Sequence, residues 1–351
     1  MSLAIFLLGA VAIGCVAAAY LLAGASWSRR SPAVAIALWQ ALGLSWGVAT
    51  VGALAGFGAS DLRGRTGSGL TSVATAATRA AKLMLGAGPA RRWDMLTTLR
   101  LVSLVAGVLL LALLCWILIA AVTAVLRARH RQRALLGLLA HDDPKVPGAL
   151  VVDHPVAAAY CVPGLRSAIV ISAGTLDLLD QAELAAVLAH ERAHIRARHD
   201  LVLLPFTALL RAFRWSEIAW EANREVALLV EMMADDRAQR RRPAKELATA
   251  LLRVGVSGGG VAPTGALAIG GGSADRHGPL VSIGRPFGRH AAPIATGPVA
   301  PPARAMDGQL AARVTRLLRP PPGLSVGATV LVGVVAAALV AAPALAMVLP
   351  L

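Results

Sequence analysis

Residues 180–197 read DQAELAAVLAHERAHIRA. The stretch opens with Asp180, and Glu183 follows three residues later. This spacing is typical of a capping box, in which the two side chains satisfy backbone N–H groups in the first turn of a helix. It predicts a helix from Gln181 to about Ala197.

The predicted helix carries two histidines on one face. His190 and His194 are four residues apart, so their imidazoles can converge on a single ion. Glu191 lies beside the first histidine, where it can act on a water molecule bound to that ion. This is the H-E-x-x-H arrangement of zincins, in which zinc lowers the pKa of its water to about 7 and the glutamate is the base. An accidental match, at roughly one in a hundred for a chain this long, is the alternative.

A catalytic zinc site needs a third protein ligand, and a second helical stretch offers one. Residues 216–240 contain Glu231, with Asp235 one turn later. Glu231 would complete a His₂Glu site, and Asp235 would accept the outer N–H of a ligand imidazole and fix its tautomer. Two alternatives stay open: the two carboxylates form a solvated helix face, or Glu221 or Glu225 is the ligand instead.

Three short β-prone runs lie upstream of the metal helix, at residues 149–153, 157–161 and 167–172. A Pro163-Gly164 turn joins the last two. In a zincin, the last strand before the metal helix can pair with an extended substrate backbone. The runs therefore predict an α+β, zincin-like domain.

The composition indicates a membrane protein. Of 351 residues, 57% are hydrophobic and 15% are charged, whereas soluble proteins carry about 25% charged residues. Four segments have the roughly 20 apolar residues that a helix needs to cross a bilayer. They are residues 3–24, 33–57, 101–126 and 324–349. We therefore expect a mainly α protein with four transmembrane helices and the metallopeptidase-like domain between the third and the fourth.

Arg29 and Arg30 follow the first span, and positive flanks tend to stay in the cytosol. The N-terminus is then outside, residues 58–100 form an external loop, and the metal-binding domain is cytosolic at the plasma (inner) membrane. The basic residues of the external loop disagree with this orientation. Residues 70–85 within it are expected to form an amphipathic helix on the membrane surface.

The expected organisation has four parts. Residues 1–126 hold three spans, 127–253 the metallopeptidase domain, 254–305 a disordered Gly/Pro-rich linker, and 306–351 a juxtamembrane helix and the fourth span. The net charge of +15 suits basic loops beside lipid headgroups. Direct nucleic-acid binding is not expected, because no basic run is interleaved with aromatic residues.

Four stretches resemble the BlaR/MecR family of membrane metallopeptidases. They are YCVPG at 160–164, IVISAG at 169–174, residues 183–194 with the H-E-x-x-H motif, and EMMAD at 231–235. More distantly, the chain is similar to the HtpX/Ste24 group, which shares H-E-x-x-H followed by E-x-x-x-D. The resemblance covers roughly residues 127–240 and the four-span layout in outline.

The resemblance implies a cytosolic gluzincin domain that acts in regulated proteolysis. His190, His194 and Glu231 correspond to zinc ligands, Glu191 to the catalytic base and Asp235 to the supporting carboxylate. It also implies a protein substrate such as a transcriptional repressor.

The chain departs from this family in two places. The family carries a penicillin-binding sensor domain after its fourth span, whereas this sequence ends at Leu351, so sensing through such a domain is not expected. An acidic residue is expected shortly after the second metal-binding histidine, and His199-Asp200 meets it. Asp200 is therefore predicted as a second supporting carboxylate, and His199 as a spare ligand, an outer support or a surface residue.

The leading functional hypothesis is a zinc metalloendopeptidase that cleaves a protein at the cytosolic face of the membrane. An intramembrane protease is disfavoured because Arg192, Arg196 and Arg198 surround the motif, and charges are costly at membrane depth. A transporter is disfavoured because no predicted span holds a charged residue. The alternative from another class is a non-catalytic signalling or scaffold protein with a structural zinc site, which would not need Glu191.

Overall fold

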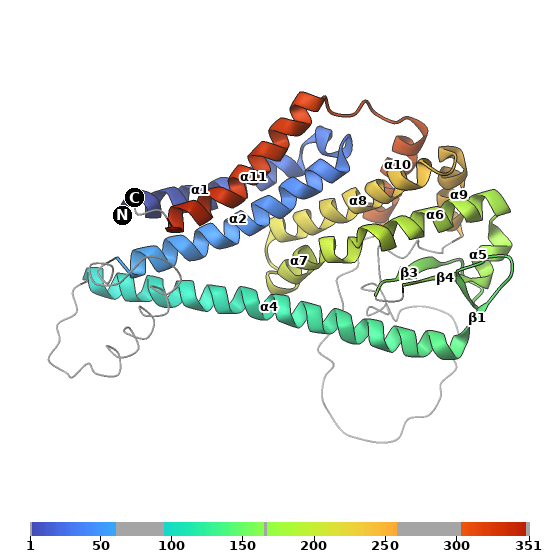
Figure 1. Ribbon diagram of the computed structural model, residues 1–351, viewed down its shortest axis with the longest axis horizontal. Helices are drawn as coiled ribbons and strands as arrows, with labels where there is room; N and C mark the ends of the chain where they lie inside the picture. The colour runs from blue at the N-terminus through green and yellow to red at the C-terminus, as the bar shows by residue number, and fades with distance from the viewer. Residues whose placement is uncertain (1, 61–94, 165–166, 258–302, 349–351) are drawn as a thin grey trace, which may run out of the picture. The chain divides into compact units, whose positions relative to one another are not determined.

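A computed structural model describes residues 2–60, 95–164, 167–257 and 303–348 (Figure 1). Two expectations concern segments outside these residues. They are the surface helix at 70–85 and most of the Gly/Pro-rich linker at 254–305. Both stay predictions.

The four predicted apolar helices are present. Among the described residues, four helices are long and apolar enough to cross a membrane. They are α1 (Ser2–Ala23), α2 (Pro32–Gly58), α4 (Met95–Leu139) and α11 (Val326–Val348). A 3-10 turn, η1 (Ser26–Arg29), separates the first two. Helix α4 has 45 residues and continues past the predicted span through the basic stretch to Leu139.

The three predicted strands form one mixed sheet with a fourth that the sequence did not indicate. The strands are β1 (Ala140–Asp142), β2 (Leu150–Val152), β3 (Ala159–Val162) and β4 (Ala168–Ser172), in the order β1-β2-β4-β3. Strands β2 and β4 run parallel, and the other two pairs are antiparallel. Strand β1 was missed because three residues with two polar side chains carry too little alternation to read.

Six further helices complete the described structure. They are α5 (Ala173–Leu178), α6 (Gln181–Ala197), α7 (His199–Ala212), α8 (Glu217–Gln239), α9 (Ala244–Val256) and α10 (Ala303–Leu318). Helix α6 has the predicted bounds and the predicted capping box of Asp180 and Glu183. It ends at Arg198, which adopts the left-handed conformation with φ 48°. This turn sends the chain directly into α7.

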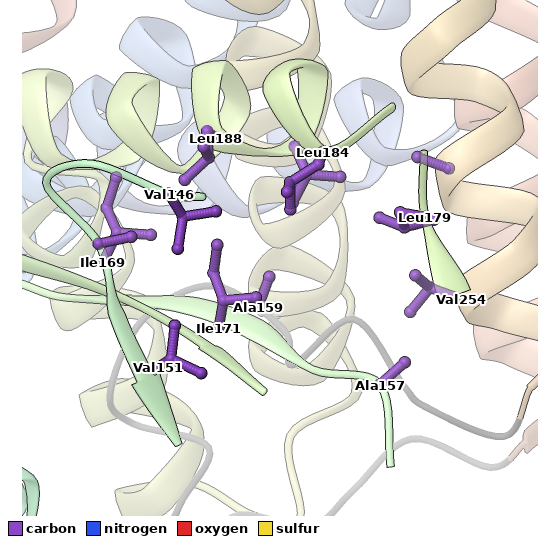
Figure 2. Packing of buried hydrophobic residues seen from close by; sticks show 13 residues of the cluster. Val146, Val151, Ala157, Ala159, Ile169, Ile171, Leu179, Leu184, Leu188 and Val254 are labelled. Atoms are coloured by element: carbon purple, nitrogen blue, oxygen red, sulfur yellow. The ribbon is translucent and has the colours of Figure 1, made fainter. Parts of the chain in front are cut away.

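Apolar side chains of the sheet pack beneath α6. Figure 2 shows Val151, Ile169 and Ile171 of the strands in one cluster with Leu184 and Leu188 of α6. Each fully buried aliphatic side chain of this kind contributes roughly 1.5–3 kcal/mol to folding. The sheet thus packs against one face of α6, and both histidines of this helix are buried as well.

The described chain divides into two compact units, and each combines separate stretches of sequence. The first, which we call the span unit, comprises Met1–Thr123, Leu203–Met233 and Pro321–Leu351. The second, which we call the sheet unit, comprises Ala124–Val202 and Ala234–Pro320. Helix α8 is continuous across the point of division. The domain bounds expected from the sequence stay predictions.

Candidate metal centre

Helix α6 presents its two histidines to one point. His190 and His194 are 3% and 5% exposed, and their Nε2 atoms lie 3.0 Å apart. The i, i+4 spacing and the burial of this face of the helix bring the rings together. The outer nitrogen of each ring is also in contact: His190 Nδ1 lies 2.9 Å from Asp235 Oδ1, and His194 Nδ1 lies 2.8 Å from His199 Nδ1. The Nε2 atoms are therefore the ones that could bind a common ion.

Asp235, on α8, connects His190 to a cation. The Arg313 guanidinium of α10 donates to both carboxylate oxygens of Asp235, over 2.9 Å from Nε and 2.8 Å from Nη2. Burial by itself raises the pKa of Asp235, but Arg313 and His190 outweigh it and lower the pKa to about 2. Asp235 is therefore an ionised carboxylate with Oδ1 2.9 Å from the outer nitrogen of His190.

Glu231 lies one helical turn before Asp235 on α8 and is buried. Ligand atoms of His190, His194 and Glu231 all lie within 4.8 Å of one another, so the three residues could hold a metal ion. Two imidazole nitrogens and one carboxylate are the donor set that zinc accepts in catalytic sites with an open fourth position. The residues present thus fit zinc by number, chemistry and proximity.

Glu191 is buried beside the first histidine and has a neighbour that the sequence did not indicate. Burial, followed by the charge of the Glu191 carboxylate, raises the pKa of the Cys161 thiol on β3. Cys161 is therefore a neutral thiol near this carboxylate at physiological pH. Glu191 and His190 also line a small cavity with apolar walls.

The outer nitrogen of His194 contacts His199, which is 1% exposed. Arg237 of α8 lies behind it, with Nη1 3.0 Å from His199 Nε2. A guanidinium only donates, so His199 Nε2 is the acceptor in this contact. His199 is thus neither a surface residue nor one of the three grouped ligand residues.

Other candidate carboxylates have different partners. Asp200 pairs with Arg129 of α4, and the structure shows His199 rather than Asp200 behind His194. Glu225 lies 3.3 Å from Arg224 and 3.6 Å from Arg29. Glu221 also pairs with Arg224. Neither Glu221 nor Glu225 is in the group of residues that could hold a metal.

Comparison with known proteins points to the same chemistry. Residues 125–234 match the model of peptidase family M48. Metallopeptidases of family M48 depend on a metal, usually zinc, so the match supports a metallopeptidase function for this segment. The M48 segment contains the four strands, α6 and Glu231, and it ends one residue before Asp235. No curated protein and no solved structure matches the chain significantly.

Proposed function

We propose that the chain is a membrane-embedded zinc metalloendopeptidase that cleaves a protein at the cytosolic face of the membrane. The observation that carries the proposal is the convergence of His190, His194 and Glu231 beside Glu191 within a segment that matches family M48. The four apolar helices support membrane embedding.

The protein's own groups have distinct roles in this reaction. His190, His194 and Glu231 would hold zinc, which when bound supplies a Lewis acid that activates water and polarises a carbonyl. Glu191 accepts a proton from the attacking water and returns it to the leaving amine. Asp235 would help to orient the His190 ring, because its Oδ1 lies 2.9 Å from the ring's outer nitrogen.

The sheet indicates where an extended substrate would pair. Strand β4, the last strand before the metal helix, lies between β2 and β3, so both its edges are occupied. Strand β3 contacts α6 more extensively than β4 does and has no further described strand on its outer side. We therefore place the substrate backbone along β3 by strand addition, rather than along the last strand as the sequence suggested.

The decisive test is Glu191→Gln in the purified full chain. We expect cleavage of an unfolded protein such as casein to fall by at least about 10²–10⁴-fold, because the proton acceptor is lost. Zinc content, measured by mass spectrometry, should stay near that of the wild type. Glu221→Gln, on α8 and outside the metal group, is the control and should keep its activity. Full activity in Glu191→Gln would reject the mechanism, and bound zinc without any cleavage in the wild type would favour the scaffold alternative.

The finer biological role follows the resemblance to the BlaR/MecR family. We propose a plasma-membrane location, a cytosolic catalytic domain, and regulated cleavage of a repressor or similar protein. Protease protection of tags at the N-terminus and after residue 257 in intact cells tests the orientation. A tag after residue 257 that is digested from outside would overturn the cytosolic placement.

A further inference from the structure

Helix α10 brings a cation to the metal centre from outside the segment that matches M48. Arg313 lies 78 residues beyond Asp235 in sequence, after the 258–302 segment and shortly before α11. Its side chain is buried, with the residue 6% exposed. A buried arginine needs a partner, and both oxygens of Asp235 supply it.

The contact fixes the direction of the Asp235 carboxylate. A guanidinium is planar, and its Nε and Nη2 donors bind the two carboxylate oxygens in parallel, which leaves the carboxylate little freedom to rotate. Oδ1, held by Nη2, is also the oxygen that lies 2.9 Å from His190 Nδ1. The orientation of the His190 ring, and with it the direction of Nε2, thus depends on Arg313.

We propose that Arg313 is a positioning residue of the metal centre, which orients the ligand His190 through Asp235 and thereby raises metal affinity. The inference rests on the proposed metal site and extends it, because it makes α10 a part of that site. Docking of α10 then becomes a condition for tight metal binding.

A purely structural role is the competing explanation, and the same helix offers a matched control. Arg316, one turn beyond Arg313 on the same stretch of α10, pairs with Asp236 of α8 through both its terminal nitrogens. Leu317 also docks α10 in a core cluster with residues of α6 and α9. Both arginines connect the same two helices, but only the partner of Arg313 contacts a metal ligand.

The experiment compares Arg313→Met with Arg316→Met in the purified full chain. Zinc affinity is measured by competition with a chromophoric chelator, and the Co²⁺ absorption spectrum reports ligand geometry. We expect Arg313→Met to weaken zinc binding about 10- to 100-fold and to alter the Co²⁺ spectrum, as loss of an outer partner does at other metal sites. Arg316→Met should stay within about twofold of the wild type, as expected of an ion pair away from the ligands. Equal losses in both variants, or no loss in Arg313→Met, would overturn the proposal.

Two further variants make the test independent of folding and of the proposed function. In an Asp235→Asn background, Arg313→Met should have little additional effect, because the two residues act as one unit. If Arg313→Met does not accumulate as folded protein, Arg313→Lys provides the test. Lysine keeps the positive charge but lacks the two parallel N–H donors of the guanidinium, so this variant should still bind zinc several-fold more weakly than the wild type. Wild-type affinity in Arg313→Lys would then reject the proposal. A wild-type chain that binds no zinc would instead reject the proposed function itself.

Discussion

The two ligand imidazoles are supported by different groups. A carboxylate held by Arg313 stands behind His190, whereas a second imidazole held by Arg237 stands behind His194. The Asp235 carboxylate can only accept, whereas His199, whose Nε2 accepts from Arg237, carries its proton on Nδ1 and cannot accept an N–H from His194. We therefore expect His190 to be the more firmly oriented of the two.

His199→Phe tests the support of His194. The substitution keeps a ring of similar size but removes both nitrogens, so His194 Nδ1 and Arg237 lose their partner. We expect zinc affinity to fall about 10- to 100-fold, measured by chelator competition. His141→Phe, at an exposed position of β1, is the control and should bind like the wild type. Unchanged affinity in His199→Phe would show that its contact with His194 does not support the ligand.

Glu225 is expected to make the stability of the protein depend on pH, independently of the metal site. Burial raises its pKa, Arg29 and Arg224 act in the opposite direction, and Glu221 adds to the rise. Because the folded-state pKa lies above the unfolded value, this contribution to stability is present at low pH and is lost as pH rises through the folded-state pKa. From about pH 4 toward neutrality, the wild type should therefore lose stability relative to Glu225→Gln. Thermal unfolding of both proteins over this range measures the difference, and parallel pH profiles would contradict it.

At the scale of one element, α6 is defined at both ends. The Asp180 carboxylate accepts the N–H of Glu183 over 2.8 Å, and the Glu183 carboxylate accepts the N–H of Asp180 over 3.0 Å. Arg253 of α9 adds an ion pair to Glu183 at 2.9 Å. These contacts fix where the helix begins. The left-handed turn at Arg198 fixes where it ends, and α7 then starts with His199 in contact with His194.

Asp180→Ala removes the cap without touching the metal centre. We expect a loss of about 1 kcal/mol in the free energy of unfolding, as is usual for an N-cap replaced by alanine. Asp177→Ala, exposed on α5, should change it by no more than about 0.5 kcal/mol. Denaturant titration of the full chain followed by circular dichroism makes the comparison. Equal stability of the two variants would mean that tertiary packing alone fixes the start of α6.

At the scale of the whole molecule, part of the M48 segment (residues 125–234) belongs to the span unit. Most of α7 and the first part of α8 group with the apolar helices. Phe206 of α7 packs edge-on against Trp39 of α2, with ring centroids 6.4 Å apart, and both residues are buried. Helix α7 of the M48 segment thus packs its apolar side chains against α2, the second apolar helix.

A fragment of residues 127–320 should therefore not behave as a soluble domain. Without α2, the Phe206 face of α7 is exposed to water, and exposed apolar patches promote association. We expect the fragment to aggregate in size-exclusion chromatography, whereas the full chain in detergent elutes as a single species. Phe206→Ser in the fragment should reduce the aggregation. A monodisperse, cooperatively folded fragment would contradict the shared packing and favour an independent domain.

The sequence by itself determined the features that local patterns carry. Apolar runs of sufficient length defined four helices, the spacing of Asp180 and Glu183 defined the start of α6, and the i, i+4 spacing of His190 and His194 placed both rings on one face. Three strands followed from short β-prone runs. Each of these signals lies within a few turns of chain, where side-chain periodicity and capping act directly.

Only the tertiary structure decided which residues surround the metal ligands. Arg313 meets Asp235, Cys161 meets Glu191, and β3 rather than β4 has the outer edge of the sheet. The tertiary structure also shows that Glu221 and Glu225 pair with Arg224, whereas Glu231 lies close to His190 and His194. The contacts of Arg313 with Asp235 and of Glu231 with the two histidines join segments that are far apart in sequence, and a long-range contact depends on how helices pack. That packing is a property of the whole core and leaves no periodic trace in either segment.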